Sequence, residues 1–213
     1  METRHFVVNM IEENCYLFWD ETKEAALVDC GAFYANELKP IEETMEREGL
    51  HLACLLNTHA HFDHIWGTAA MVRKYNVPLM LCRDERDTYE AAPEQLKAFL
   101  HREIPLELTD NVQYFAPDAV LRVGGLEVKV IPTPGHTPGG VCFYVEQAGV
   151  LFSGDSLFRH SIGRCDLPGG NEAQLTGALR DRVLTLPEEV RVLPGHGPET
   201  TIGEERKCNF YIR

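Results

Sequence analysis

Histidines and a carboxylate gather in one short segment of the chain, NTHAHFDH over residues 57–64. This segment follows a predicted buried strand and precedes a predicted helix. Residues two apart in an extended segment project to the same side, so His59 and His61 can present their imidazoles to one cation. Asp63 is predicted as the N-cap of the helix, and the turn there lets Asp63 and His64 reach a second position nearby. Neutral imidazoles and carboxylates are ligands of zinc and similar transition metals, so the segment predicts a metal site.

Three further candidate ligands each follow a predicted strand. His136 lies in TPGHTPG over 133–139, Asp155 in SGD over 153–155, and His196 in PGHG over 194–197. A single loop histidine is more often a structural residue than a ligand. Four such segments at strand ends in one chain favour one shared site, because strand ends are held by a rigid sheet.

Strand and helix patterns alternate along the chain, which predicts a layered α/β architecture with sheets inside and helices outside. Strands are expected over 6–8, 16–19, 25–28, 52–56, 126–131, 141–145, 150–152 and 190–193. Helices are expected over 36–48, 65–75, 83–91, 94–102 and 172–186. The pattern is weakest over 92–118, which is interpreted as an insertion over one face.

Composition narrows the range of partners. The chain has 213 residues with 33 acidic and 20 basic side chains, a formal charge of −13 that repels phosphate backbones and argues against nucleic-acid binding. No apolar run approaches the ~20 residues of a membrane-spanning helix, and the N-terminus resembles no secretory leader. We therefore expect a cytoplasmic protein that binds neither nucleic acid nor membrane, whose seven cysteines are mostly buried, reduced thiols.

The four segments together resemble the pattern of the metallo-β-lactamase-fold hydrolases over nearly the whole chain. The resemblance implies a four-layer αββα sandwich over residues 1–213, with the metal site at one edge of the two sheets. It also implies two divalent cations, zinc in the first place, with iron or manganese as alternatives. The implied ligands are His59, His61 and His136 for the first cation, Asp63, His64 and His196 for the second, and Asp155 between them.

Asp29 stands in the segment VDCG over 28–31, where the family usually has an aspartate that supports the metal site from behind the ligands. In that role Asp29 would hold a histidine N–H. An aspartate in a turn beside Gly31 is an equally good interpretation of the sequence alone.

Within the family the chain most resembles the small glyoxalase II-like branch. The segment 161–170 contains the G-R-x-D pattern at Gly163, Arg164 and Asp166, and the ending from 194 to 206 is also similar. Full-length glyoxalase II enzymes continue into a helical domain whose basic residues hold glutathione. This chain ends about 17 residues after His196, so that domain is not expected. Arg164 either contacts substrate or, as we prefer, pairs with Asp166.

The predicted chemistry is metal-assisted hydrolysis. Water bridging two divalent cations loses its proton readily, and the resulting hydroxide attacks the carbonyl of a small thioester, ester or lactone. Asp63 would orient this nucleophile and carry its proton, while Asp29 would support the reaction through a histidine. The predicted function is a thioesterase that cleaves acyl-glutathione or related thioesters.

Other functions are compatible with the same residues. A persulfide dioxygenase of this family has a similar pattern but binds one iron through two histidines and one aspartate. A lactonase would use all the same ligands, and a metal-binding or sensor protein would use them without catalysis. A true β-lactamase is not expected, because those enzymes are exported. The oligomeric state is left open.

Overall fold

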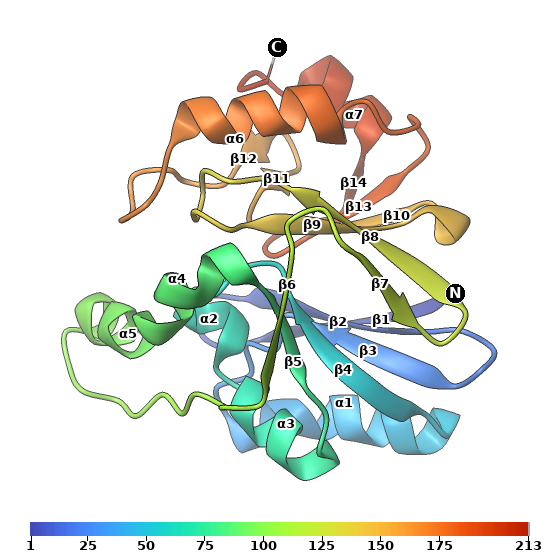
Figure 1. The fold of residues 1–213 in the computed structure, drawn as a ribbon, viewed down its shortest axis with the longest axis vertical. Coiled ribbons are helices and arrows are strands. Elements are labelled where there is room, and N and C mark those ends of the chain that lie inside the picture. The colour runs from blue at the N-terminus through green and yellow to red at the C-terminus, as the bar shows by residue number, and fades with distance from the viewer. Residues whose placement is uncertain (213) are drawn as a thin grey trace.

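Two six-stranded sheets pack face to face in the computed structural model, which describes residues 1–212, and helices cover both outer faces (Figure 1). This confirms the predicted αββα sandwich. The first sheet has the order β1 (Glu2–Val8), β2 (Glu13–Trp19), β3 (Glu24–Val28), β4 (His51–Asn57), β5 (Leu79–Cys82), β6 (Val112–Phe115). The second has the order β14 (Thr200–Thr201), β13 (Arg191–Pro194), β10 (Val150–Gly154), β9 (Val141–Val145), β8 (Leu126–Pro132), β7 (Val120–Val123).

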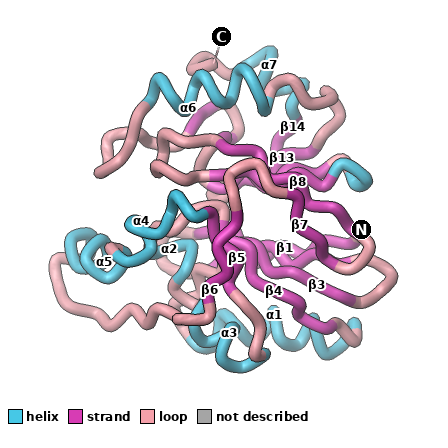
Figure 2. Tube along the Cα trace, viewed as in Figure 1, coloured by secondary structure: helices cyan, strands magenta, loops and turns pink. Residues whose placement is uncertain are grey.

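The helices lie on the outside of the sheets, and all of the sheet strands lie between them (Figure 2). They are α1 (Ala35–Glu48), α2 (Phe62–Ile65), α3 (Thr68–Tyr75), α4 (Arg86–Glu90), α5 (Ala92–Leu100), α6 (Glu172–Ala178) and α7 (Ile202–Cys208). A small hairpin of β11 (Leu157–Phe158) and β12 (Ser161–Ile162) lies between β10 and α6 in the sequence. None of the helices formed by residues 1–212 has the length and apolar character needed to cross a membrane.

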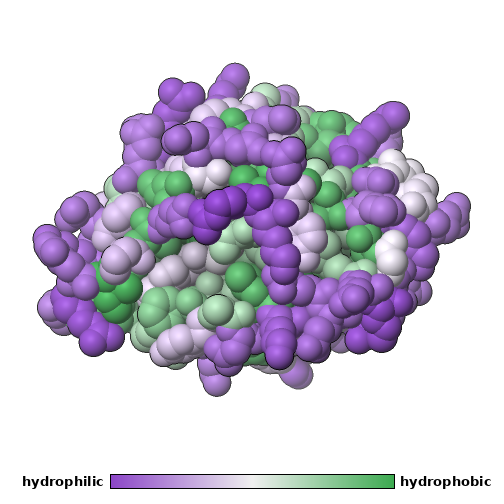
Figure 3. Space-filling view, turned by 90° about the horizontal axis from the view of Figure 1, so that it is seen from below, coloured by the Kyte–Doolittle hydropathy of each residue, from purple (hydrophilic) through white to green (hydrophobic). Residues whose placement is uncertain are grey.

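Apolar side chains fill three layers between these elements. Strand β2 is buried on both faces: Leu17 packs towards α1 and α3, and Phe18 packs between the sheets. Phe18 stacks there on Phe152 of β10, with ring centroids 5.3 Å apart. Outside the second sheet, Leu151 of the same strand belongs to one apolar cluster with Leu175 of α6. The period of two along each strand thus sends alternate residues into different layers. Viewed from below, towards the side that carries α1 and α3, the surface is largely hydrophilic, with separate apolar patches (Figure 3).

Three predictions about local structure are wrong. The helix expected from residue 65 begins at Phe62, its N-cap is His61, and Asp63 lies in the first turn rather than at the cap. The helix is also interrupted between Ile65 and Thr68, where Gly67 donates its N–H to the Cys30 carbonyl at 2.8 Å. The helix expected over 172–186 becomes a π-helical turn after Ala178 and ends at Val183.

The segment 92–118 is more than an insertion. Its first part forms α5, and its last part forms β6, which pairs in parallel with β5 at the edge of the first sheet. The short strand β6 is flanked by polar residues and gives little periodic signal, which is why the sequence pattern missed it. The cysteines agree with expectation: no disulfide forms among residues 1–212, and five of the seven thiols are buried.

Candidate metal centre

The predicted ligands come from four chain segments and meet at one edge of the two sheets. The loop after β4 and the start of α2 carry four of them, and the loops that follow β8, β10 and β13 carry one each. These residues are His59, His61, Asp63, His64, His136, Asp155 and His196. Because β3, β4 and β5 run in parallel, and β10 runs parallel to β13, the carboxyl ends of β4, β10 and β13 deliver these residues to the same region.

The first group is formed by three buried histidines. One ring nitrogen from each of His59, His61 and His136 lies within 4.8 Å of the others. His61 Nδ1 is 2.9 Å from His136 Nε2, and their rings are perpendicular. The three nitrogens therefore point at a common position, as ligands of one cation do.

The second group joins Asp63, His64 and His196, which also lie within 4.8 Å of one another. His196 Nε2 is 3.2 Å from Asp63 Oδ2. Asp155 stands between the two groups: its Oδ1 is 3.3 Å from His64 Nε2, and its Oδ2 is 3.6 Å from His136 Nε2. This is where a carboxylate shared by two cations would be needed.

Two of the histidines make hydrogen bonds through the ring nitrogen that points away from the centre, and these bonds determine which nitrogen carries no proton. His136 Nδ1 donates to the Arg164 carbonyl at 2.7 Å, and His196 Nδ1 donates to the Ile11 carbonyl at 3.1 Å. A carbonyl only accepts, so each Nδ1 must carry the proton and each Nε2 of these neutral rings keeps a free lone pair. His64 Nδ1 faces the Asp29 carboxylate at 3.1 Å, so a proton on this nitrogen has a negatively charged neighbour.

Asp29 lies behind the candidate ligands and contacts His64 and Thr58. Its Oδ1 accepts the Thr58 N–H at 2.8 Å, and its Oδ2 accepts the Thr58 hydroxyl at 2.7 Å. The Thr58 oxygen is in turn 3.1 Å from His59 Nδ1, which can donate to it. Asp29 thus orients His64 directly and His59 through Thr58. Its backbone also has a left-handed φ of 47°, which is common in turns.

The site has polar atoms that a cation would satisfy. Three buried ligand atoms have no hydrogen-bond partner among the described residues: His59 Nε2, His64 Nε2 and Asp155 Oδ1. Gly195 leaves the space around two of them open, because a Cβ there would lie 2.3 Å from Asp155 Oδ1 and 2.6 Å from His64 Cε1. Buried polar atoms are costly unless they are paired, and this mixture of imidazole and carboxylate suits zinc, iron or manganese. The residues present therefore fit divalent cations.

Burial and neighbouring charges set the ionisation of the site. Burial, with the nearby His64 and His136, holds the pKa of His59 well below its ordinary value, and burial lowers the pKa of His61 to about 4. Burial also lowers the pKa of His64, but the Asp155 and Asp63 carboxylates outweigh it and raise that pKa. Neutral His59 and His61 are ready to bind a metal, whereas at His64 a cation has to compete with a proton.

The sequence matches the family model described as the metallo-beta-lactamase superfamily over residues 11–196. The chain belongs to the metallo-β-lactamase superfamily. It is 32% identical to the hydroxyacylglutathione hydrolase GloC of Haemophilus influenzae, over 96% of this chain and 95% of that protein. Family membership and the His/Asp cluster together identify a metal-dependent hydrolase of this superfamily.

Solved structures of the superfamily have the same fold. The BLEG-1 B3 metallo-β-lactamase has a TM-score of 0.88 at 34% identity, with 99% of both chains covered. TTHA1623 in a di-iron-bound form has a TM-score of 0.84 at 35% identity, covering 98% of this chain and 99% of that one. ETHE1 from Myxococcus xanthus has a TM-score of 0.79 at 26% identity, covering 99% and 84%.

Two buried glutamates contribute to the site without any signal in the sequence spacing. Glu85 accepts the Ala60 N–H at 2.9 Å and the Gly139 N–H at 2.7 Å, so one carboxylate connects the loop of His59 and His61 to the loop of His136. Glu13 accepts the Gly31 N–H at 3.2 Å, and its other oxygen is 3.9 Å from His64 Nδ1. Both come from parts of the chain far from the motifs.

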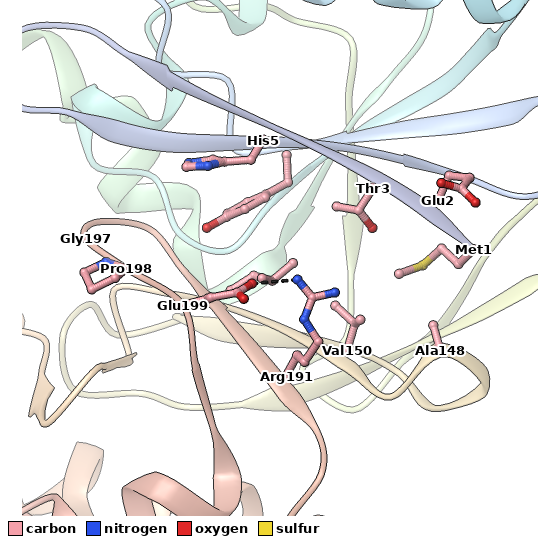
Figure 4. A pocket seen from close by; sticks show the side chains of 12 residues that line it. Met1, Glu2, Thr3, His5, Ala148, Val150, Arg191, Gly197, Pro198 and Glu199 are labelled. Atoms are coloured by element: carbon pink, nitrogen blue, oxygen red, sulfur yellow. Dashed lines mark hydrogen bonds and ion pairs between the residues drawn. The ribbon is translucent and has the colours of Figure 1, made fainter.

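A further set of contacts holds the loop of His196. The Tyr16 hydroxyl and the Asn14 amide both donate to the Pro194 carbonyl, at 2.9 Å each, and Asn14 also donates to the Gly197 carbonyl at 2.8 Å. A cavity of about 550 Å³ lies on the other side of this loop, with His5 on one wall and the Arg191–Glu199 ion pair on the other (Figure 4). It is lined by none of the predicted ligands.

A larger cavity of about 790 Å³ includes five of the seven predicted ligands in its wall. His61, Asp63, His136, Asp155 and His196 line it. Arg164 lines it too, and its guanidinium forms two hydrogen bonds to the Asp166 carboxylate, at 2.7 and 2.8 Å. The expected pairing of Arg164 with Asp166 is therefore confirmed.

Proposed function

We propose that the protein is a thioesterase that hydrolyses small acyl-thioesters, acyl-glutathione or related compounds, with two divalent cations at this centre. The observation that carries the proposal is the position of Asp155 between two complete ligand groups, one of three histidines and one of Asp63, His64 and His196. The similarity to GloC, named as a hydroxyacylglutathione hydrolase, supports a thioester as substrate.

The reaction adds water across the thioester: a C–O bond forms, the C–S bond breaks, and a carboxylic acid and a thiol are released. When bound, two divalent cations would acidify water and polarise the carbonyl oxygen. His196 and His64 lower the pKa of the Asp63 carboxyl in spite of its burial, so Asp63 is ionised at neutral pH. Its carboxylate lines the cavity and is positioned to orient the attacking water, accept its proton and pass it to the departing sulfur.

Asp29 and Thr58 act on the reaction only through the histidines. They keep the His64 and His59 rings turned so that each Nε2 faces the centre. Removal of such a hydrogen-bond partner of a ligand typically reduces metal affinity or activity by about 10–100-fold.

A mononuclear-iron persulfide dioxygenase is the second candidate, favoured by the similarity to ETHE1. It would need only two histidines and one aspartate for its iron. The additional group of Asp63, His64 and His196 supports the hydrolase, because it offers ligands for a second cation beyond those that one iron needs.

Metal analysis followed by a substrate panel on the same preparation tests the proposal. We expect two metal equivalents per chain and hydrolysis of S-lactoylglutathione or another acyl-thioester in the panel, which also includes a lactone, a β-lactam and glutathione persulfide. The Asp63→Asn variant should retain metal through its amide oxygen less well and lose most of the hydrolysis. One iron per chain with oxygen uptake on the persulfide, and no thioester hydrolysis, would refute the proposal.

A further inference from the structure

The cavity over the metal centre has one wall that is largely apolar. Residues of α5 and of the loop after β12 contribute most of it, among them Ala98, Phe99, Leu167 and Pro168. Phe99 is 51% exposed although large apolar side chains in this protein are mostly buried. Its exposed surface lies in the cavity wall, where an apolar group of a ligand can cover it.

This apolar wall begins at the metal centre itself. Phe62 stands between His61 and Asp63 in the sequence, and its ring packs against the Phe99 ring with centroids 5.1 Å apart. The Phe62 ring also packs against the Trp66 ring, with centroids 5.7 Å apart. Phe62 is only 8% exposed, so its neighbours hold the ring in place. A group bonded to a carbonyl carbon at the centre therefore meets the Phe62–Phe99 pair within a few atoms.

Away from the candidate metal ligands, the charged side chains that line the cavity are mainly acidic. Asp87 and Glu94 line it on the side of α4 and α5. Arg164 is the one lining side chain of the described residues with a permanent positive charge, and the Asp166 carboxylate already neutralises it. Glutathione carries two carboxylates and one ammonium group, so a glutathione thioester brings net negative charge towards acidic side chains and finds no uncommitted arginine or lysine in the lining.

We propose that the preferred substrate is a thioester with an apolar acyl chain, which packs on the Phe62–Phe99 pair, and with a thiol that carries no negative charge. This deepens the proposed function and rests on it. The site would then select by the length of the acyl chain and by the charge of the thiol, rather than by contacts to glutathione.

Four thioesters test both parts of the proposal on the metal-loaded full chain. Acetyl and hexanoyl groups are each joined to glutathione and to the uncharged thiol N-acetylcysteamine, and kcat/KM is measured for all four. A fully buried methylene is worth about fourfold in affinity or rate. Because the wall is partly open, we expect hexanoyl to exceed acetyl by at least about tenfold on either thiol. The uncharged thiol should exceed glutathione by about threefold or more, with a smaller ratio at high salt.

Two variants assign these effects to residues. Phe99→Ser should reduce the hexanoyl-to-acetyl ratio by about threefold or more, and the matched change Phe210→Ser, at an exposed phenylalanine that does not line the cavity, should not change it. Glu94→Gln should reduce the preference for the uncharged thiol over glutathione. Its control is Glu21→Gln in the β2–β3 turn, also outside the cavity lining.

The outcomes separate the two levels of inference. If neither these four thioesters nor S-lactoylglutathione is hydrolysed, the proposed function itself fails. If S-lactoylglutathione alone is hydrolysed, the proposed function stands and the assignment of the apolar wall is overturned. If they are hydrolysed but acetyl and hexanoyl are equal, or glutathione is the better thiol, the proposed function stands and the assignment of the apolar wall is overturned. A ratio that Phe99→Ser leaves unchanged would also overturn it, because another surface would then bind the acyl chain.

Discussion

Glu85 gives the most quantitative test of how the site is built. Its carboxylate is fully buried and accepts one backbone N–H from each of two ligand loops, those of Ala60 and Gly139. Burial raises the pKa of Glu85 from 4.5 to about 7, against the opposing effect of these hydrogen bonds. The folded protein therefore binds this proton more tightly than the unfolded chain does.

The sign and size of the effect follow from linkage. Because the unfolded chain releases the proton first, the free energy of unfolding falls as the pH rises from about 4.5 towards 7. Each pKa unit corresponds to about 1.4 kcal/mol, so complete ionisation of Glu85 costs the folded state about 3 kcal/mol, of which about 2.5 kcal/mol falls between pH 5 and 8. Glu85→Gln removes the titration. It also places an amide NH₂ against one of the two backbone donors, which costs about 1–3 kcal/mol at every pH.

Urea unfolding of metal-free wild type and Glu85→Gln, followed by circular dichroism at pH 5, 6, 7 and 8, measures this difference. We expect the wild type to be the more stable protein at pH 5, and its advantage to shrink by about 2–3 kcal/mol by pH 8. The exposed Glu21→Gln variant should show no such trend. If the advantage of the wild type instead grows with pH, the N–H donors outweigh burial, and the ionised carboxylate is the form that the fold stabilises.

Three further predictions concern the metal centre. Thr58→Val removes the hydroxyl between Asp29 and His59 and should weaken metal binding about 10–100-fold in competition with a chromogenic chelator; unchanged affinity would show that His59 needs no support. Gly195→Ala puts a Cβ 2.3 Å from Asp155 Oδ1 and should destabilise the protein by about 1–3 kcal/mol and lower the metal content; two equivalents bound at wild-type affinity would contradict this. Chelation should lower the midpoint of thermal unfolding, and added Zn²⁺ should restore it; a midpoint that ignores metal would argue against the centre.

The hydrophobic patterns along the sequence were sufficient to predict much of the secondary structure. The period of two in β8 predicted a half-exposed strand, and Leu126–Pro132 alternates between buried and more exposed positions as expected. The strands β2, β3, β4, β9 and β10 were predicted from apolar runs. The bounds of β9 were predicted as observed, and the other four were placed one to three residues short at one or both ends. Short edge strands such as β6 were missed, because four residues are too few to establish a period and their stability comes from the neighbouring strand.

The candidate site also has features that the sequence predicted and features that it did not. The spacing of His59, His61, Asp63 and His64 was sufficient to suggest two cation positions, and the structure gathers His136, Asp155 and His196 around them. The helix start at Phe62 shows where local reasoning fails. Asp63 was assigned to capping by its type, but the N-cap is His61, two residues earlier than expected, and the Asp63 carboxylate lies 3.6 Å from His64 Nε2 instead.

The sequence by itself determined the chemistry of this protein: which ligands it offers, that they follow strands, and which superfamily has this pattern. Only the tertiary structure decided how that chemistry is supported. Glu13 and Glu85, remote from every motif, are brought behind the site by strand pairing and helix packing, and α5 supplies the apolar cavity wall. The physical reason is that a ligand motif is local in the chain. The hydrogen bonds that hold ligands, and the surfaces that bind a substrate, are made between segments that only folding brings together.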